Sequence, residues 1–258
     1  MEEFYFTENF AGYNLFYAPV CNSTNDVAQI CAGIYGLKTP LAVYSFDQRK
    51  GRGQGNNLWE SEPGKNLAIT FLQDDSLATK TSPVAFNKCI ALGVRDTLQK
   101  LTGLAVKIKW PNDMYHDGYK LSGLLMESLL LAGELKVLSV GIGINVNQVV
   151  FKGNFKASSL HLATGEYYEL INVVHELTYQ ISSYTNKLRL YNSQVINELY
   201  HEHLYQVNQQ IVLDLAEGTQ ITGTLSNIDD SGRIVLIDHE GKKMAFHHGE
   251  ARIAKEKR

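Results

Sequence analysis

The sequence has few cysteines and no leader pattern. Its 258 residues include only Cys21, Cys31 and Cys89, and their spacing fits no zinc motif. An odd and sparse set of this kind is typical of reduced thiols in a cytosolic protein. The first ten residues carry acidic side chains where a signal peptide carries basic ones, and no apolar segment follows. We therefore expect a cytoplasmic protein.

An excess of positive charge is also missing. The formal net charge is −3, so the sequence offers no basic footprint for nucleic acid. No run approaches the roughly 18 consecutive apolar residues that a membrane-spanning helix needs. These absences predict a protein that binds neither nucleic acid nor a membrane.

The composition that remains is that of an ordinary globular protein, 44% hydrophobic and 20% charged. A chain of this length can bury a sizeable core. Near residue 206 the pattern changes to short β-rich runs separated by Gly and Asp turns. We predict a larger domain at 1–206 and a small SH3-like β-barrel at 207–258.

The larger part alternates strand and helix patterns irregularly. Strand patterns cover 13–19, 41–46, 66–73 and 104–110, and two further strands joined near 132–135 cover most of 122–147. Helical patterns cover 23–36, 82–103 and 168–205. The irregular order disfavours a doubly wound fold and predicts an α+β fold, with a mixed, mainly antiparallel sheet and flanking helices.

Two of these helices have clear end signals. Ser82 is a predicted N-cap, Pro83 follows at the first helical position, and Gly103 ends the pattern. In the earlier helix, Ser23 or Thr24 is the predicted cap, with an acidic residue in the first turn.

The stretch QRKGRGQGNNLWES, residues 48–61, concentrates glycine, amide and basic side chains. It matches neither a phosphate-binding P-loop nor a dinucleotide fingerprint. Its glycines allow close backbone approach, Arg52 offers donors for a carboxylate or phosphate, and Trp59 can cover a planar group. These features predict a loop that orders over a ligand. A merely flexible hairpin tip is the alternative.

Three further segments place polar groups at strand ends. Asn112 and Asp113 follow Pro111, although Pro-Asn-Asp is also a common turn sequence. Lys120 precedes an apolar strand in which Gly123 allows close approach, although a surface lysine is the plainer reading.

The last of these segments is GIGIN at 141–145. Gly141 and Gly143 weaken an apolar strand unless something lies against its backbone, and Asn145 emerges at its end. Together with the glycine-rich loop, the three segments predict a cleft over a sheet for a planar, phosphate-bearing ligand.

The ordered motifs give the sequence its resemblance to a known family. They are STN at 23–25, GRG at 51–53, KWPND at 109–113, KLSG at 120–123 and GIGIN at 141–145. In this order, and followed by a small β-rich region, they resemble the biotin protein ligases. The resemblance covers most of the chain and implies the short form that lacks an N-terminal DNA-binding domain.

The resemblance implies a role for each matching residue. The biotin-binding residues it implies are Ser23, Thr24, Gln48, Gly51, Arg52, Lys120 and Gly123. The residues it implies for ATP or the adenylate are Trp59, Asn112, Asp113, Gly141 and Asn145. Lys120 and Arg52 are the implied catalytic residues, and Mg²⁺ is expected through the ATP phosphates without a protein-built metal site. The family often has a second arginine where this chain has Gln54.

The implied activity is ATP-dependent formation of biotinyl-5′-AMP, followed by transfer of biotin to a lysine of a biotin carboxyl carrier protein. The absence of a Ser-His-Asp or Cys-His pattern suits this chemistry, which needs positioning and electrostatics but no protein nucleophile. A lipoate–protein ligase of the same architecture and a non-enzymatic ligand-binding module are the alternatives. An exposed strand edge would serve either a homodimer or the docking of the carrier, and the sequence does not choose between them.

Overall fold

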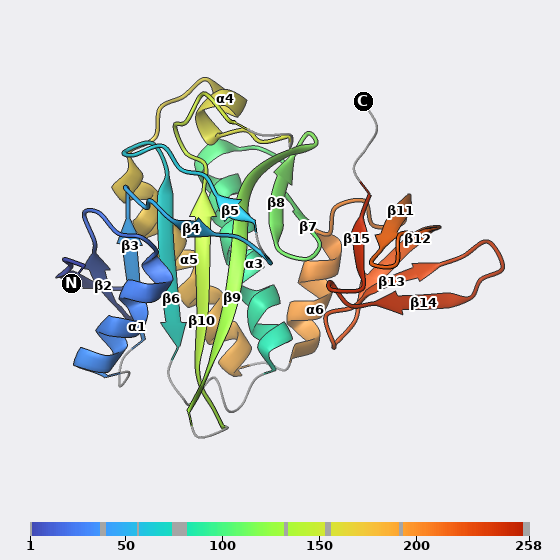
Figure 1. The fold of residues 1–258 in the computed structure, drawn as a ribbon, viewed down its shortest axis with the longest axis horizontal. Helices are drawn as coiled ribbons and strands as arrows, with labels where there is room; N and C mark the ends of the chain where they lie inside the picture. Colours follow the sequence, from blue (N-terminus) through green and yellow to red (C-terminus); the bar gives the residue numbers. More distant parts are fainter. Residues whose placement is uncertain are drawn as a thin grey trace.

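The computed structural model describes residues 2–36, 40–55, 57–73, 82–131, 134–152, 156–190 and 193–254. An eight-stranded sheet forms its centre (Figure 1). In chain order the strands are β1 (Tyr5–Phe10), β2 (Tyr13–Tyr17), β3 (Leu41–Ser45), β6 (Leu67–Gln73), β7 (Lys107–Lys109), β8 (Asp113–His116), β9 (Tyr119–Leu131) and β10 (Glu134–Ile144). Their spatial order is β1-β2-β3-β6-β10-β9-β8-β7.

The pairing of these strands confirms the expected sheet type. Strands β2 and β3 pair in parallel, and the other neighbouring pairs among the described strands are antiparallel. Strand β1, at one edge, is not predicted from the sequence. The β9–β10 hairpin is confirmed, although residues 132–133 of its turn lie outside the described residues.

The described helices are α1 (Thr24–Tyr35), α3 (Pro83–Thr102), α4 (Leu160–Thr164), α5 (Leu170–Leu190) and α6 (Ser193–Glu202). Helix α3 has the predicted ends: the Ser82 hydroxyl accepts a hydrogen bond from the Ala85 amide at 3.1 Å, and Gly103 is left-handed. Ser23 has the extended backbone of an N-cap in α1, but its side chain makes no capping hydrogen bond.

The two faces of the sheet differ because strand residues alternate between them. In β10 the even-numbered residues from Leu138 to Ile144 belong to the main hydrophobic core, which α3 and α5 cover. Gly141 and Gly143 therefore point to the opposite face. Helix α1 packs on that opposite face through a smaller apolar cluster that includes Val27 and Val43 (Figure 1). The face with the glycines is the one that carries the site.

The C-terminal region is a second, five-stranded sheet. Its strands are β11 (Gln210–Leu215), β12 (Gln220–Ile228), β13 (Ile234–Ile237), β14 (Lys243–Phe246) and β15 (Ala251–Ile253). They are antiparallel in the order β14-β13-β12-β11-β15, beside α6 in Figure 1. This confirms the predicted C-terminal β-region. We keep the division into 1–206 and 207–258 as a proposal, since residue 206 lies between α6 and β11.

A buried lysine ties this C-terminal sheet to α3. The Lys88 side chain is 2% exposed, and its ammonium lies 2.8 Å from the Asn197 Oδ1, 3.0 Å from the Ile228 carbonyl and 3.1 Å from the Asp229 carbonyl. Burial lowers the pKa of this lysine. Three acceptors match the three ammonium hydrogens, so the cation is fully hydrogen-bonded where the two parts of the chain meet.

The three cysteines are unpaired and buried. Burial raises the pKa of the Cys21 thiol to about 11. Among the described helices, none is both long enough and apolar enough to cross a membrane.

Candidate functional site

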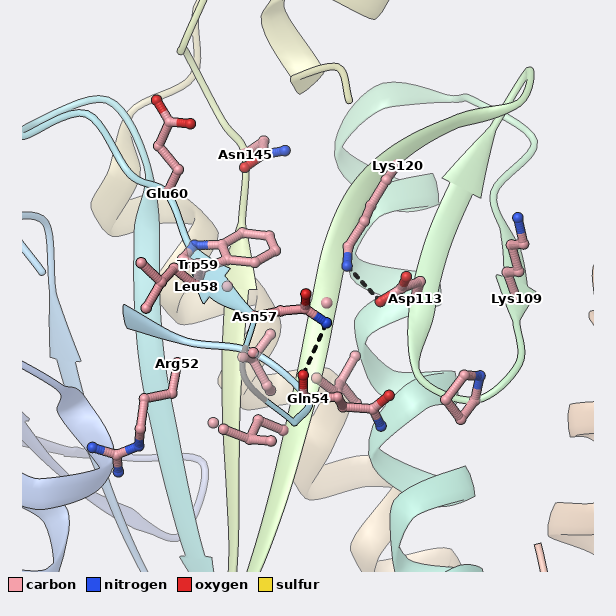
Figure 2. Close-up of a pocket in the computed structure, with 18 of the residues that line it drawn as sticks. Arg52, Gln54, Asn57, Leu58, Trp59, Glu60, Lys109, Asp113, Lys120 and Asn145 are labelled. Atoms are coloured by element: carbon pink, nitrogen blue, oxygen red, sulfur yellow. Dashed lines mark hydrogen bonds and ion pairs between the residues drawn. The ribbon is translucent and has the colours of Figure 1, made fainter. Parts of the chain in front are cut away.

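A cavity of about 550 Å³ lies on the glycine face of the main sheet. Its floor is formed by β9 and β10. Above it lies the segment 48–59, which we call the lid and in which β4 (Gly51–Arg52) pairs with β5 (Leu58–Trp59) (Figure 2). Asn56 of the lid lies outside the described residues. The cavity brings together ten of the predicted site residues: Ser23, Thr24, Gln48, Arg52, Trp59, Asp113, Lys120, Gly123, Gly141 and Asn145.

Two predicted site residues do not line this cavity. Gly51 is a buried residue of the lid itself, and a Cβ atom there would come within 2.7 Å of both the Gln48 Nε2 and the Trp59 carbonyl oxygen. Gly51 therefore leaves space for Gln48. Asn112 lines a smaller neighbouring cavity of about 390 Å³. Its Oδ1 accepts a hydrogen bond from Asn87 at 2.9 Å, and its Nδ2 donates to the Leu124 carbonyl at 3.3 Å.

Polar side chains from α1, the lid and β6 join at one end of the cavity. The Gln48 Oε1 accepts hydrogen bonds from the Thr24 amide at 2.8 Å and its hydroxyl at 3.2 Å. The Thr70 hydroxyl oxygen lies 2.8 Å from the Thr24 hydroxyl and 2.5 Å from the Asn25 Oδ1. These contacts fix the Gln48 amide so that its NH₂ group can donate to a ligand.

The floor glycines lie directly under side chains of the chain itself. A Cβ atom at Gly143 would come within 2.2 Å of the Trp59 ring, and one at Gly123 within 3.2 Å. A Cβ atom at Gly141 would come within 2.4 Å of the Asn25 Oδ1. The sequence predicts that something lies against this strand, and the structure shows these two side chains there. Figure 2 shows the Trp59 ring above the strands of the floor.

The other end of the cavity is charged. The Lys120 ammonium lies 2.7 Å from the Asp113 Oδ1 and 5.5 Å from the centre of the Trp59 ring (Figure 2). The Lys120 side chain is 23% exposed, so an anion entering the cavity can reach it. Asn145, at the end of β10, donates from Nδ2 to the Ser158 carbonyl at 3.0 Å, which leaves its Oδ1 to accept from a ligand.

Arg52 lines the cavity, but its guanidinium is engaged elsewhere. It donates two hydrogen bonds to Asp26 in the first turn of α1, at 2.9 and 2.8 Å. This pairing raises the pKa of Arg52.

The carboxylates of the site suit a metal ion brought by a substrate. The described residues contain no cluster of three metal-ligating side chains. Two acidic side chains, Glu60 and Asp113, are among those that line the cavity. A single carboxylate beside substrate phosphates is the usual way in which Mg²⁺ is held, so Asp113 fits that role.

Several residues of the site are not predicted individually from the sequence. Thr70 and Glu127 carry no motif signal, and Asn25 belongs to the STN motif without an assigned role. From the C-terminal region, His248 in the turn before β15 and Arg252 in β15 also line the cavity. Desolvation lowers the pKa of His248, and nearby Asp113 opposes that shift.

Comparisons with known proteins agree with this arrangement. Residues 17–145 match the biotin/lipoate A/B protein ligase family. The chain is 26% identical over 239 residues to the bifunctional ligase/repressor BirA of Bacillus subtilis, covering 91% of this chain and 73% of that protein. It is 24% identical over 216 residues to the biotin–[acetyl-CoA-carboxylase] ligase of Paracoccus denitrificans, covering 81% of this chain and 89% of that protein.

A solved structure is similar along nearly the whole chain. It is the biotin protein ligase of Aquifex aeolicus in complex with biotin and ATP, with a TM-score of 0.79 and 26% identity. The match covers 94% of this chain and 99% of that chain. Since the family match spans half of the sequence, this chain belongs to the biotin/lipoate A/B protein ligase family.

Proposed function

We propose that this chain is a biotin–protein ligase, which makes biotinyl-5′-AMP from biotin and ATP and transfers biotin to a lysine of a carrier protein. The observation that carries the proposal is a cavity whose neutral hydrogen-bonding end, at Gln48 and Thr24, faces a charged end formed by Lys120 and Asp113. The biotin ligases among its relatives, and the similar structure with biotin and ATP bound, support the same activity.

In the first step a carboxylate oxygen of biotin attacks the α-phosphorus of ATP, and the bond to the leaving pyrophosphate breaks. Two anions repel each other as they approach, so the reaction needs positive charge at this point. We assign that charge to Lys120, placed between the biotin carboxylate and the α-phosphate. Ser23, Thr24 and Gln48 receive the ureido ring at the opposite end.

The nucleotide occupies the remaining wall of the cavity. Trp59 covers the adenylate from the lid, and Asn145 and the Gly141 backbone contact the nucleotide. Asn112 supports this wall from the neighbouring cavity. Asp113 is the residue that would hold Mg²⁺ together with the ATP phosphates, and the ion would supply further charge neutralisation there.

In the second step the neutral amine of the acceptor lysine attacks the acyl carbon, AMP leaves, and the amine loses a proton. The mixed anhydride hydrolyses if water reaches it, so a closed lid protects the intermediate. We propose as the acceptor a biotin carboxyl carrier protein of a biotin-dependent carboxylase.

We place the reaction in the cytoplasm because the three unpaired cysteines suit a reducing compartment. A homodimer through a strand edge remains part of the proposal.

The test is ATP–pyrophosphate exchange with the purified chain. Exchange that requires biotin and does not occur with lipoate is the expected result. Exchange that prefers lipoate would make the chain a lipoate ligase, and binding of biotin without any exchange would make it a non-enzymatic binding module. Transfer is then followed by mass spectrometry of a carrier domain, with an acceptor Lys→Arg variant as the control.

A further inference from the structure

Arg52 does not point its charge at the centre of the cavity. Figure 2 shows its guanidinium directed away from Trp59 and Lys120. Both terminal nitrogens instead bond Asp26, and Nη2 also lies 3.5 Å from the Glu127 Oε2. The basic group of the lid is therefore used to attach the lid to the first turn of α1 and to β9.

The acidic side of this attachment is itself held in place. The Glu127 Oε2 accepts a hydrogen bond from the Asn25 Nδ2 at 2.8 Å. Asn25 is buried, and its Oδ1 is within hydrogen-bonding distance of the Thr70 hydroxyl. Asp26 is the next residue along α1, so its position is fixed by a helix whose neighbouring side chain is bonded to two strands of the sheet.

The same set of bonds reaches the other end of the lid. From Thr70 it continues through Thr24 to Gln48, the first residue of the lid. Arg52 and Gln48 are thus anchored to one network beneath the loop that connects them. The described backbone bonds of the inner lid, through β4 and β5 and between Gly53 and Asn57, join the lid to itself, so side-chain anchors to the rest of the molecule affect how often it opens.

We infer that Asp26 is a positioning residue which, by holding Arg52, keeps the lid closed over biotinyl-AMP until the acceptor lysine arrives. This inference rests on the proposed function. Asp26 need not touch the ligand, and its loss should change the escape of the intermediate more than its formation. The two side chains of the pair are 39% and 47% exposed, so the expected change is moderate.

The experiment measures the release of labelled biotinyl-AMP, formed on the protein and chased with excess unlabelled biotin. Asp26→Asn should release it about fivefold faster, near the upper end for an exposed ion pair. The rate of pyrophosphate exchange should change less than twofold by the same argument. Asp26→Glu, which keeps the charge, should release the intermediate more slowly than Asp26→Asn.

Two comparisons separate positioning from general damage. In the double variant Asp26→Asn/Arg52→Gln, release should match that of Arg52→Gln alone, because both changes break one contact. Asp47→Asn is the matched control: its carboxylate pairs with Arg49, only two residues away, at 3.2 Å and does not attach the lid to α1. This control should release the intermediate at the wild-type rate.

Hydrogen exchange of the ligand-free protein gives an independent readout. The Gly53 amide donates to the Asn57 carbonyl at 2.8 Å within the lid, and it should exchange faster in Asp26→Asn. Unchanged release together with unchanged exchange, or single effects that multiply in the double variant, would overturn the inference. A wild-type chain that forms no biotinyl-AMP would overturn the proposed function, while faster Gly53 exchange would still support the attachment of the lid by Asp26.

Discussion

The floor of the cavity and the tip of the lid both depend on glycine, but for opposite physical reasons. In the floor, β9 and β10 pair without interruption from Ser122–Ile144 to Glu127–Ser139, so the backbone is rigid. Its glycines provide space, because Trp59 and Asn25 fill the positions where side chains would stand. At the tip of the lid, Gly55 has a φ of +61°, and no atom of the described residues lies within 4 Å of the position that a Cβ would take. It provides conformational freedom instead of space.

This difference explains why a substitution of the glycine at the lid tip should be tolerated and a substitution of a floor glycine should not. A methyl group added to the floor meets the Trp59 ring or the Asn25 side chain, which already packs against the backbone. The same group added at the tip of the lid meets open space. Substitutions in the floor should therefore affect ligand and chemistry strongly, and those at the lid tip should affect them weakly.

The largest effect is expected for Lys120, at the start of the floor. Lys120→Ala removes the cation that faces the biotin carboxylate and should lower biotin-dependent pyrophosphate exchange about a thousandfold. The thermal unfolding temperature should change little, since the lysine side chain is partly exposed. Lys242→Ala, in the turn between β13 and β14, is the control. Exchange near the wild-type rate in Lys120→Ala would exclude the assigned role.

Gly143→Ala should have the next largest effect. Its Cβ would lie 2.2 Å from the Trp59 ring, so the ring must move. Overpacking of this kind costs about 1–3 kcal/mol. Where that cost falls on the ligand-bound state, it corresponds to roughly a 5- to 150-fold weaker Kd for biotin in calorimetry. The double variant with Trp59→Ala should bind biotin no more weakly than Trp59→Ala alone. If the second change added a further loss, the ring would not be what the glycine accommodates.

Thr70→Val tests the contacts between floor and lid. The change keeps the shape of a buried side chain but removes the hydroxyl near the Asn25 Oδ1 and the Thr24 hydroxyl. Leaving buried polar atoms without this partner should lower the free energy of unfolding by about 1–3 kcal/mol. Urea denaturation measures this loss, and calorimetry should show a several-fold weaker Kd for biotin. Thr178→Val, on α5 away from the cavity, should leave the Kd unchanged.

Gly55→Ala should have the smallest effect. The added methyl group meets open space, and a residue other than glycine costs roughly 1–2 kcal/mol at this positive φ. Steady-state exchange should stay within about twofold of wild type, as expected for a modest change in loop closure. A loss as large as that of Gly143→Ala would show that the lid and floor glycines act alike.

Much of the fold is predictable because its signals are local. Helix α3 carries its cap, its proline and its terminal glycine within its own sequence, and its observed limits agree with the prediction to one residue. Strand β1 gives no such signal, since it is an edge strand with mostly exposed side chains. Its place in the sheet depends on pairing with β2.

The residues of the site also divide into those with a local sequence signal and those without one. Lys120, which lines the cavity, is picked out by the ordered motifs and the family resemblance that they carry, although taken alone it favours a surface lysine. The direction of the Arg52 side chain cannot be predicted from the sequence, because it depends on Asp26, 26 residues earlier, and on Glu127 in another strand. Contacts of this length are set by topology, and no local pattern encodes them.

The buried ammonium of Lys88 has a consequence for how the molecule unfolds. Removing the C-terminal sheet would take two of the three acceptors from the cation and expose the main hydrophobic core, to which both sheets contribute residues. The chain should therefore lose both sheets in one cooperative transition, and an isolated N-terminal fragment should be poorly soluble. A replacement for the C-terminal sheet would have to provide carbonyl acceptors for Lys88 at the positions of Ile228 and Asp229.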